Sequence, residues 1–375
     1  MSRAHRGYPK EDSGKGLKIG LVLAGLVALA LAGVLVNLAL FSNDHSERLG
    51  GPTSLLTHAN EEQAPTIAGY TITLDTSAYP GAALAENKVF SEFGQQVSSL
   101  PFATLDSMRF TGWFTGPIDD AGATRVDNNS LYLLALDTDQ TLYAHFDPRP
   151  TSIDYDDPGL PILMYHYFYD PALGEDGEDV NWMDIHLFES HLAWLQSQNY
   201  YYPTWEEVVA YIRGEIVLPQ PSIVLTSDDG FESFFRLALP LVAQYDARMT
   251  SFIILAQQQP DMFTGLDPSR VIFQSHSYDM HQGGYDGDAR ILTASYDEIY
   301  EDALIGGQIL GNMLAYCYPF GKTNANARQA LFDAGVGVAL VIENERAYPL
   351  CDPMAVPRLR MSDGASAEYL ASVAY

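Results

Sequence analysis

Strand-like and helix-like patterns of hydrophobic residues alternate along the C-terminal half of the chain. Short apolar runs have the length of buried strands, and between them apolar residues return at helical spacing. The apolar runs are residues 161–165, 222–226, 250–255, 314–318 and 336–342, and the helical patterns cover 188–198, 204–212, 234–245, 299–310 and 325–334. Strands that alternate with helices predict an α/β domain with a parallel sheet, closed or open, over residues 161–375.

A different pattern marks residues 65–146, where apolar and polar residues alternate one by one. The alternation is clear at 70–74, and further strand-like segments follow at 110–115 and 141–146. A period of two is typical of strands with one buried face. These segments predict a small β-rich domain, followed by a Pro- and Asp-rich linker at 147–160.

The longest apolar run is residues 19–41, which at about 23 residues is long enough to cross a bilayer. Residues 1–18 carry five Lys/Arg and two Asp/Glu, and such an excess marks the cytoplasmic side. The pattern predicts a cytoplasmic basic tail (1–18), a transmembrane helix (19–41), a polar stalk (42–64) and an extracytoplasmic remainder at the cell membrane. A cleaved signal peptide is the alternative, although its apolar core is normally shorter. Both place the remainder outside the cytoplasm.

Composition narrows the possible functions. The formal net charge is −28, and a surface so acidic repels phosphates, which excludes nucleic acid as a partner. The two cysteines, Cys317 and Cys351, do not form a Cys-x-x-Cys motif, which excludes a zinc knuckle. Whether they pair with each other stays open.

Metal-type ligands gather where predicted strands end. Asp228 and Asp229 follow one strand, His166 follows another, and His276 and His281 lie five residues apart in a predicted loop. Two adjacent carboxylates can divide roles, so that one binds a cation and the other acts as a base beside it. Neutral imidazole suits Zn²⁺, Co²⁺, Ni²⁺ or Fe²⁺. Each pattern alone is more typical of a solvated turn or a structural histidine.

Taken together, these motifs resemble the polysaccharide deacetylases of the NodB-homology type, carbohydrate esterase family 4. The motifs that carry the resemblance are Asp228-Asp229-Gly230, the pair His276 and His281, and Tyr318-Pro319-Phe320-Gly321. The opening Pro-Ile-Leu-Met-Tyr-His166 and the later Val356-Pro357-Arg358 are similar to the branch that contains the poly-N-acetylglucosamine deacetylases. The resemblance covers roughly residues 160–365.

The resemblance implies a distorted (β/α) barrel of about seven strands with one divalent metal ion. Asp229, His276 and His281 would hold the ion, with zinc as the first expectation and cobalt or nickel as alternatives. Such a site leaves positions open for water and for the acetyl oxygen, and a metal lowers the pKa of bound water towards about 7.

The same resemblance implies the remaining roles. Asp228 would be the general base, and His166 the general acid that protonates the leaving nitrogen. The backbone N–H near Phe320, after Pro319, would stabilise the oxyanion together with the metal.

The sequence also departs from the family pattern. Ser227 stands where Phe is usual, and we expect it to loosen the packing below the site. Cys317 replaces the Arg that normally pairs with the base, so we predict that Arg358 takes its place. The C-terminal Leu-x-His motif is missing, because residues 359–375 contain no His. In the branch that this sequence resembles, a His near the start of the domain takes the role of acid, and the resemblance assigns that role to His166.

The β-rich region has a resemblance of its own, to the internalin-type B repeat (Listeria–Bacteroides repeat), a β-grasp-like surface module. It rests on Phe110-Thr-Gly-Trp113-Phe-Thr115 and Thr141-Leu-Tyr-Ala-His-Phe146. The region is either a spacer with Trp113 in its core or a module that contacts cell wall or glycan.

The leading functional hypothesis is a hydrolase that removes N-acetyl groups from a surface polysaccharide or peptidoglycan containing N-acetylglucosamine. O-Deacetylation of another glycan is an alternative, because the same site would cleave esters. A catalytically inactive glycan-binding protein and a phosphoesterase are the remaining alternatives. The presence of all the expected ligands and the base argues against the inactive form.

Overall fold

The computed structural model describes residues 68–374, except for 96, 98–99, 127–133, 259–265 and 284–288. The predicted basic tail, transmembrane helix and stalk lie outside the described residues. Within the described part, no helix is both long and apolar enough to cross a membrane.

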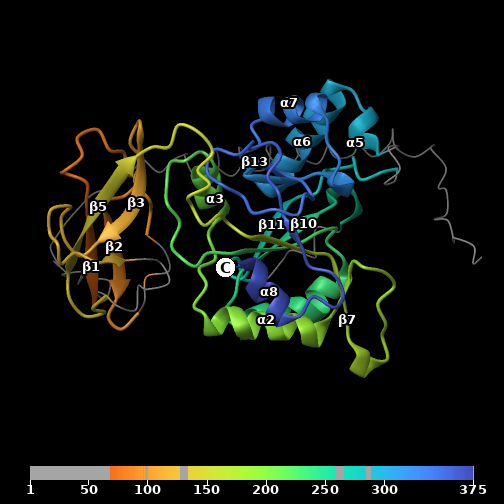
Figure 1. The fold of residues 1–375 in the computed structure, drawn as a ribbon, viewed down its shortest axis with the longest axis horizontal. Helices are drawn as coiled ribbons and strands as arrows, with labels where there is room; N and C mark the ends of the chain where they lie inside the picture. Colours follow the sequence, from red (N-terminus) through yellow and green to blue (C-terminus); the bar gives the residue numbers. More distant parts are fainter. Residues whose placement is uncertain are drawn as a thin grey trace, which may run out of the picture. The chain divides into compact units, whose positions relative to one another are not determined.

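The N-terminal part of the described chain forms a five-stranded sheet in the order β2-β1-β5-β3-β4 (Figure 1). Its strands are β1 (Gly69–Asp75), β2 (Lys88–Glu92), β3 (Met108–Phe114), β4 (Arg125–Val126) and β5 (Gln140–Pro148). The strands predicted at 70–74, 110–115 and 141–146 are therefore confirmed. Trp113 is buried and its ring contacts Phe110 at 5.2 Å, which places it in the core of this sheet. No helix accompanies the described residues of 69–148, so the β-grasp form stays a prediction.

The C-terminal part is built on a seven-stranded sheet in the order β13-β12-β11-β10-β9-β6-β14, with every pairing parallel. Its strands are β6 (Ile162–Tyr165), β9 (Val224–Ser227), β10 (Met249–Ile253), β11 (Val271–Ser275), β12 (Ala315–Cys317), β13 (Val338–Leu340) and β14 (Leu359–Arg360). β13 and β14 form its two edges. This parallel-strand half-barrel is consistent with the expected distorted (β/α) barrel of the NodB type.

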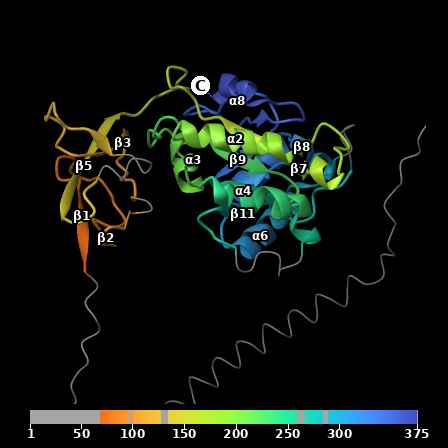
Figure 2. The same cartoon turned by 90° about the horizontal axis from the view of Figure 1, so that it is seen from below.

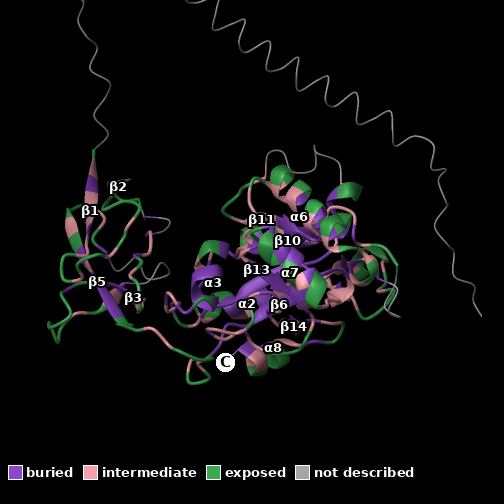
Figure 3. Ribbon diagram, turned by 90° about the horizontal axis from the view of Figure 1, so that it is seen from above, coloured by how far each residue is buried: buried purple, intermediate pink, exposed green. Residues whose placement is uncertain are grey.

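Helices follow most of these strands and turn their polar faces outward. They are α2 (Ile185–Ser197), α3 (Trp205–Ile212), η3 (Phe234–Ala238, a π-helix), α4 (Leu239–Gln244), α5 (Arg290–Thr293), α6 (Tyr296–Leu310), α7 (Ala325–Asp333) and α8 (Ala367–Ala374). α2 and α8 lie side by side in both views (Figures 1 and 2). The sheet strands are buried, whereas the helices carry exposed outer faces (Figure 3). The core therefore lies along the sheet.

Local sequence explains several element boundaries. Thr204 and Glu207 form a capping box at the start of α3, each accepting a hydrogen bond from the other's backbone N–H. The helix predicted at 234–245 exists, but it opens with the π-turns of η3 before α4 continues it. Short elements complete the fold, namely β7 (Tyr167–Tyr169), β8 (Trp182–Asp184), η2 (Pro171–Leu173), η4 (Leu255–Gln257) and η6 (Pro319–Gly321).

Candidate metal centre and catalytic site

The candidate residues meet because parallel strands end at one edge of the sheet. β6 and β9 pair in register at Tyr165 and Ser227, so the residues that follow them, His166 and Asp228, emerge side by side. β11 ends at Ser275, directly before His276. Ligand sites in such sheets are commonly built at these carboxyl ends.

The turn after β9 separates the two adjacent carboxylates. Asp229 has φ = 73° and Gly230 has φ = 68°, both in the left-handed region. That conformation is common for glycine but costs an aspartate about 1–3 kcal/mol, a strain typical of functional sites. The sharp turn directs Asp228 and Asp229 to different partners.

Asp229, His276 and His281 converge on one point. Asp229 Oδ1 lies 3.3 Å from His276 Nε2 and 3.4 Å from His281 Nε2. The three potential ligand atoms lie within 4.8 Å of one another. Asp229 Oδ1 is buried and has no hydrogen-bond partner among the described residues. A buried carboxylate oxygen without a partner, facing two imidazole nitrogens, fits a divalent metal ion.

Neighbouring groups orient these ligands. The Nδ1–H of His276 donates to the Cys317 carbonyl oxygen at 2.9 Å, which leaves Nε2 to face Asp229. Burial, together with the neighbouring His276, lowers the pKa of His281 to about 4, so this imidazole is neutral at pH 7 and able to bind a metal. Burial would raise the pKa of Asp229, but the nearby imidazoles of His276, His166 and His281 lower it to about 2.

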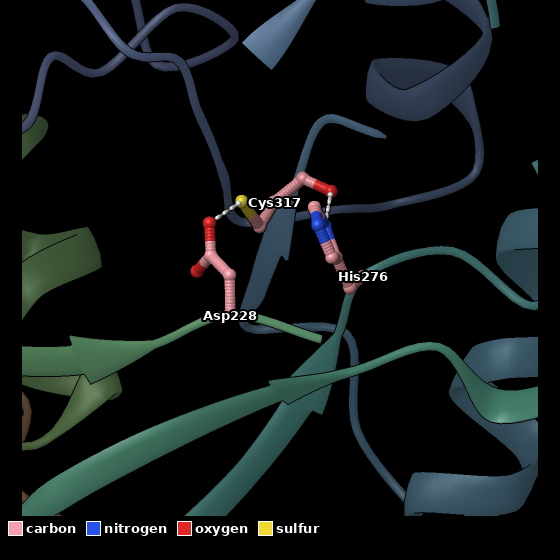
Figure 4. A group of neighbouring side chains, drawn as sticks. All are labelled: Asp228, His276 and Cys317. Atoms are coloured by element: carbon pink, nitrogen blue, oxygen red, sulfur yellow. Dashed lines mark hydrogen bonds between the residues drawn. The ribbon is translucent and has the colours of Figure 1, made fainter. Parts of the chain in front are cut away.

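A second group of possible ligands, Asp228, His276 and Cys317, lies next to the first (Figure 4). Its polar atoms already have partners. The Cys317 thiol donates to Asp228 Oδ2 at 3.4 Å, and the Cys317 carbonyl accepts from His276. Because the orphaned oxygen belongs to Asp229, the geometry favours a metal at Asp229, His276 and His281.

Asp228 is held by a buried arginine, as expected. Arg358 is 0% exposed and binds both carboxylate oxygens, with Nη1–Oδ1 and Nη2–Oδ2 distances of 2.8 Å. Its Nε–H also donates to the Val341 carbonyl at 3.1 Å. Burial would raise the pKa of Asp228, but the guanidinium overrides this and holds the pKa well below its ordinary value. Asp228 is therefore an ionised carboxylate at neutral pH.

His166 also lies close to Asp228. Its Nε2 is 3.9 Å from Asp228 Oδ2, and the side chain is largely buried. Burial lowers the pKa of His166, although the carboxylates of Asp228 and Asp229 partly oppose this. A lowered pKa makes a protonated imidazole a stronger acid. Ser227, expected to loosen the packing, instead donates its hydroxyl to the His166 carbonyl at 2.8 Å and joins the two strand ends.

Pro319 and Phe320 form the short helix η6 beside the metal ligands. Phe320 has φ = 56°, and its ring lies 4.3 Å from the His281 ring. The segment is thus adjacent to the site, while the oxyanion role stays a prediction. Cys317 and Cys351 are both free thiols.

One residue at the site was not singled out from the sequence. The Tyr167 hydroxyl donates a hydrogen bond to Asp229 Oδ2, whereas Oδ1 faces His276 and His281. The available signal was its place directly after His166, at a strand end. Tyrosine is so often a core residue that this place alone carried no inference.

The chain is similar to known polysaccharide deacetylases. Residues 216–339 match the family model described as polysaccharide deacetylase. The chain is 24% identical over 248 residues to a poly-beta-1,6-N-acetyl-D-glucosamine N-deacetylase of Staphylococcus aureus (strain MSSA476). That alignment covers 58% of this chain and 84% of the staphylococcal protein. The chain is also 27% identical over 95 residues to the putative polysaccharide deacetylase YxkH of Bacillus subtilis, covering 25% and 32% of the two chains. The structure of Streptococcus pyogenes deacetylase PplD in complex with acetate shares the fold, with a TM-score of 0.50 and 20% identity over 58% of this chain and 99% of that one.

Proposed function

Because this chain belongs to the polysaccharide deacetylases, hydrolases that act on the amide bond of N-acetyl groups, we propose that it deacetylates a polysaccharide of β-1,6-linked N-acetylglucosamine. The staphylococcal relatives, named for that activity, support this substrate. The linkage and the sugar are the specific parts of the proposal.

One observation carries the proposal: the unpartnered Asp229 Oδ1 faces two imidazoles, and an ionised Asp228 stands beside it. Asp229, His276 and His281 would hold one divalent ion, for which zinc suits the donor set best and cobalt or nickel are alternatives. Such an ion acidifies water and polarises an acyl oxygen.

The protein's own groups supply the proton transfers. Asp228, kept ionised by Arg358, accepts the proton of the attacking water on a carboxylate oxygen. His166 Nε2, 3.9 Å from that carboxylate, donates a proton to the departing nitrogen, because nitrogen leaves poorly as an amide anion. The backbone N–H near Phe320 supports the developing oxyanion.

We further propose that the enzyme works at the cell envelope. The apolar run 19–41 with its basic flank would anchor the chain in the cell membrane, with the catalytic domain outside the cytoplasm. The β-rich region would provide cell-wall or glycan contact. Both ideas rest on the sequence patterns alone.

Acetate release from β-1,6-linked N-acetylglucosamine oligomers, in the presence of Zn²⁺, Co²⁺ or Ni²⁺, tests the function. Asp228→Asn should lower kcat by at least about 100-fold, because it removes the base. Asp297→Asn, at an exposed position on α6, is the matched control and should retain the wild-type rate. Equal release by wild type and Asp228→Asn would refute the mechanism. Release from acetylated xylan alone would favour O-deacetylation.

A further inference from the structure

Three aromatic rings cluster beside the metal ligands. The ring of Tyr167 lies 5.1 Å from that of Trp182 and 5.0 Å from that of Phe231, and the last two are 5.8 Å apart. All three pairs are tilted or edge-to-face, so the rings form one continuous group. None of them has a part in the chemistry proposed above.

The group is attached to the catalytic residues through the chain and through a hydrogen bond. Tyr167 directly follows His166, and its hydroxyl binds Asp229. Phe231 comes two residues after Asp229, beyond the sharp turn at Gly230. Trp182 is the register partner of Tyr167 in the β7–β8 pair. The cluster therefore begins at the side chain that binds a predicted metal ligand.

The cluster is open to solvent, unlike the core rings that lie near it. Phe231 is 46% exposed, and Tyr167 and Trp182 are partly exposed, whereas Phe168 and Phe188 are fully buried. Single exposed apolar side chains are common, but three contiguous aromatic rings at a catalytic site mark a binding surface.

We propose that Tyr167, Trp182 and Phe231 form a stacking platform for the sugar unit next to the one being deacetylated. The inference rests on the proposed function and adds how the enzyme holds its polymer. The C–H bonds on a pyranose face complement the electron-rich face of an aromatic ring, without any charge on the sugar. The reacting sugar brings its acetyl group to Asp229. The platform begins at the ring of Tyr167, whose hydroxyl binds Asp229, so the platform meets the neighbouring sugar.

Steady-state kinetics of the purified full-length chain on a β-1,6-linked N-acetylglucosamine pentamer test this platform. Phe231→Ala should raise KM about tenfold and change kcat less than about twofold, since the lost contact is made equally in the ground state and the transition state. Phe231→Tyr keeps the ring and should restore a KM close to wild type. The control is Phe332→Ala on α7, an exposed phenylalanine outside the cluster.

Trp182→Ala provides a second, independent variant with the same expected rise in KM. If both alanine variants keep the wild-type KM, or if kcat falls while KM is unchanged, the platform is refuted. Calorimetric titration of the pentamer separates this inference from the proposed function. If the wild type releases no acetate, the deacetylase proposal fails. Weaker pentamer binding by Phe231→Ala than by Phe332→Ala would still support the platform. Equal binding by the two variants would overturn the platform.

Discussion

In the described part of the chain, Arg358 is the only positively charged side chain within hydrogen-bonding distance of the buried Asp228 carboxylate. Replacing Arg358 with Met removes this partner. Methionine fills a similar volume but leaves the carboxylate without both 2.8 Å hydrogen bonds. The Val341 carbonyl and the Thr226 hydroxyl also lose a donor. The perturbation therefore leaves an uncompensated buried charge.

The expected loss in the free energy of unfolding is about 3–5 kcal/mol, the cost of breaking a buried ion pair from one side. That is a large part of the roughly 5–15 kcal/mol that stabilises a typical domain. Asp228→Asn removes the charge itself, so the double variant should be more stable than the sum of the two single losses predicts. Arg328→Met is the control, because the side chains of the Arg328–Asp352 ion pair at 2.8 Å are 40% and 49% exposed and the pair should contribute at most about 1 kcal/mol.

Urea unfolding of the metal-free protein measures these differences, and EDTA is needed because a bound ion would stabilise the folded state by mass action. A loss below about 1 kcal/mol for Arg358→Met would refute the reasoning. So would strict additivity in the double variant.

Three further predictions concern single contacts. Tyr167→Phe keeps the ring but frees Asp229 Oδ2, and zinc affinity measured by chelator competition should fall about tenfold, whereas an unchanged affinity would argue against the orienting role. Burial lowers the pKa of His191, so the unfolded chain takes up a proton more readily and stability should fall as the pH drops below about 6.5. His191→Gln can keep both hydrogen bonds and should flatten that fall in urea titrations at pH 5 and 7; an equal fall would contradict it. Thr204→Ala removes the cap of α3 and should cost about 1 kcal/mol in the same assay, and no loss would contradict it.

The parts of the fold with strong local patterns could be predicted from the sequence. β6 is a fully buried apolar run, β9 is fully buried and begins with Val224 and Leu225, and the capping box at Thr204 has an unambiguous signature. β11 was missed as a strand because its pattern is mixed, with Gln274 inside it, and β14 is only two residues long. Such strands are stabilised by their neighbours in the sheet rather than by local preference.

The candidate site divides in the same way. The ligand types marked Asp228, Asp229, His166, His276 and His281 as candidates, and the family resemblance selected Asp229, His276 and His281 from them as the metal ligands. Arg358 was predicted as the partner of Asp228 because Cys317 stands where the family has its usual Arg. The contact between Tyr167 and Asp229 and the ring cluster with Trp182 depend on tertiary geometry. They join segments about 60 and 15 residues apart, and no local pattern encodes such a contact.

Equilibrium binding of Co²⁺ or Zn²⁺ to the purified chain tests the central claim most directly. The account predicts one ion per chain, lost in His281→Ala and retained in Cys317→Ser, because the ion is bound at Asp229 rather than at the neighbouring thiol group. An ion that remains bound in His281→Ala, or one that is lost in Cys317→Ser alone, would contradict it.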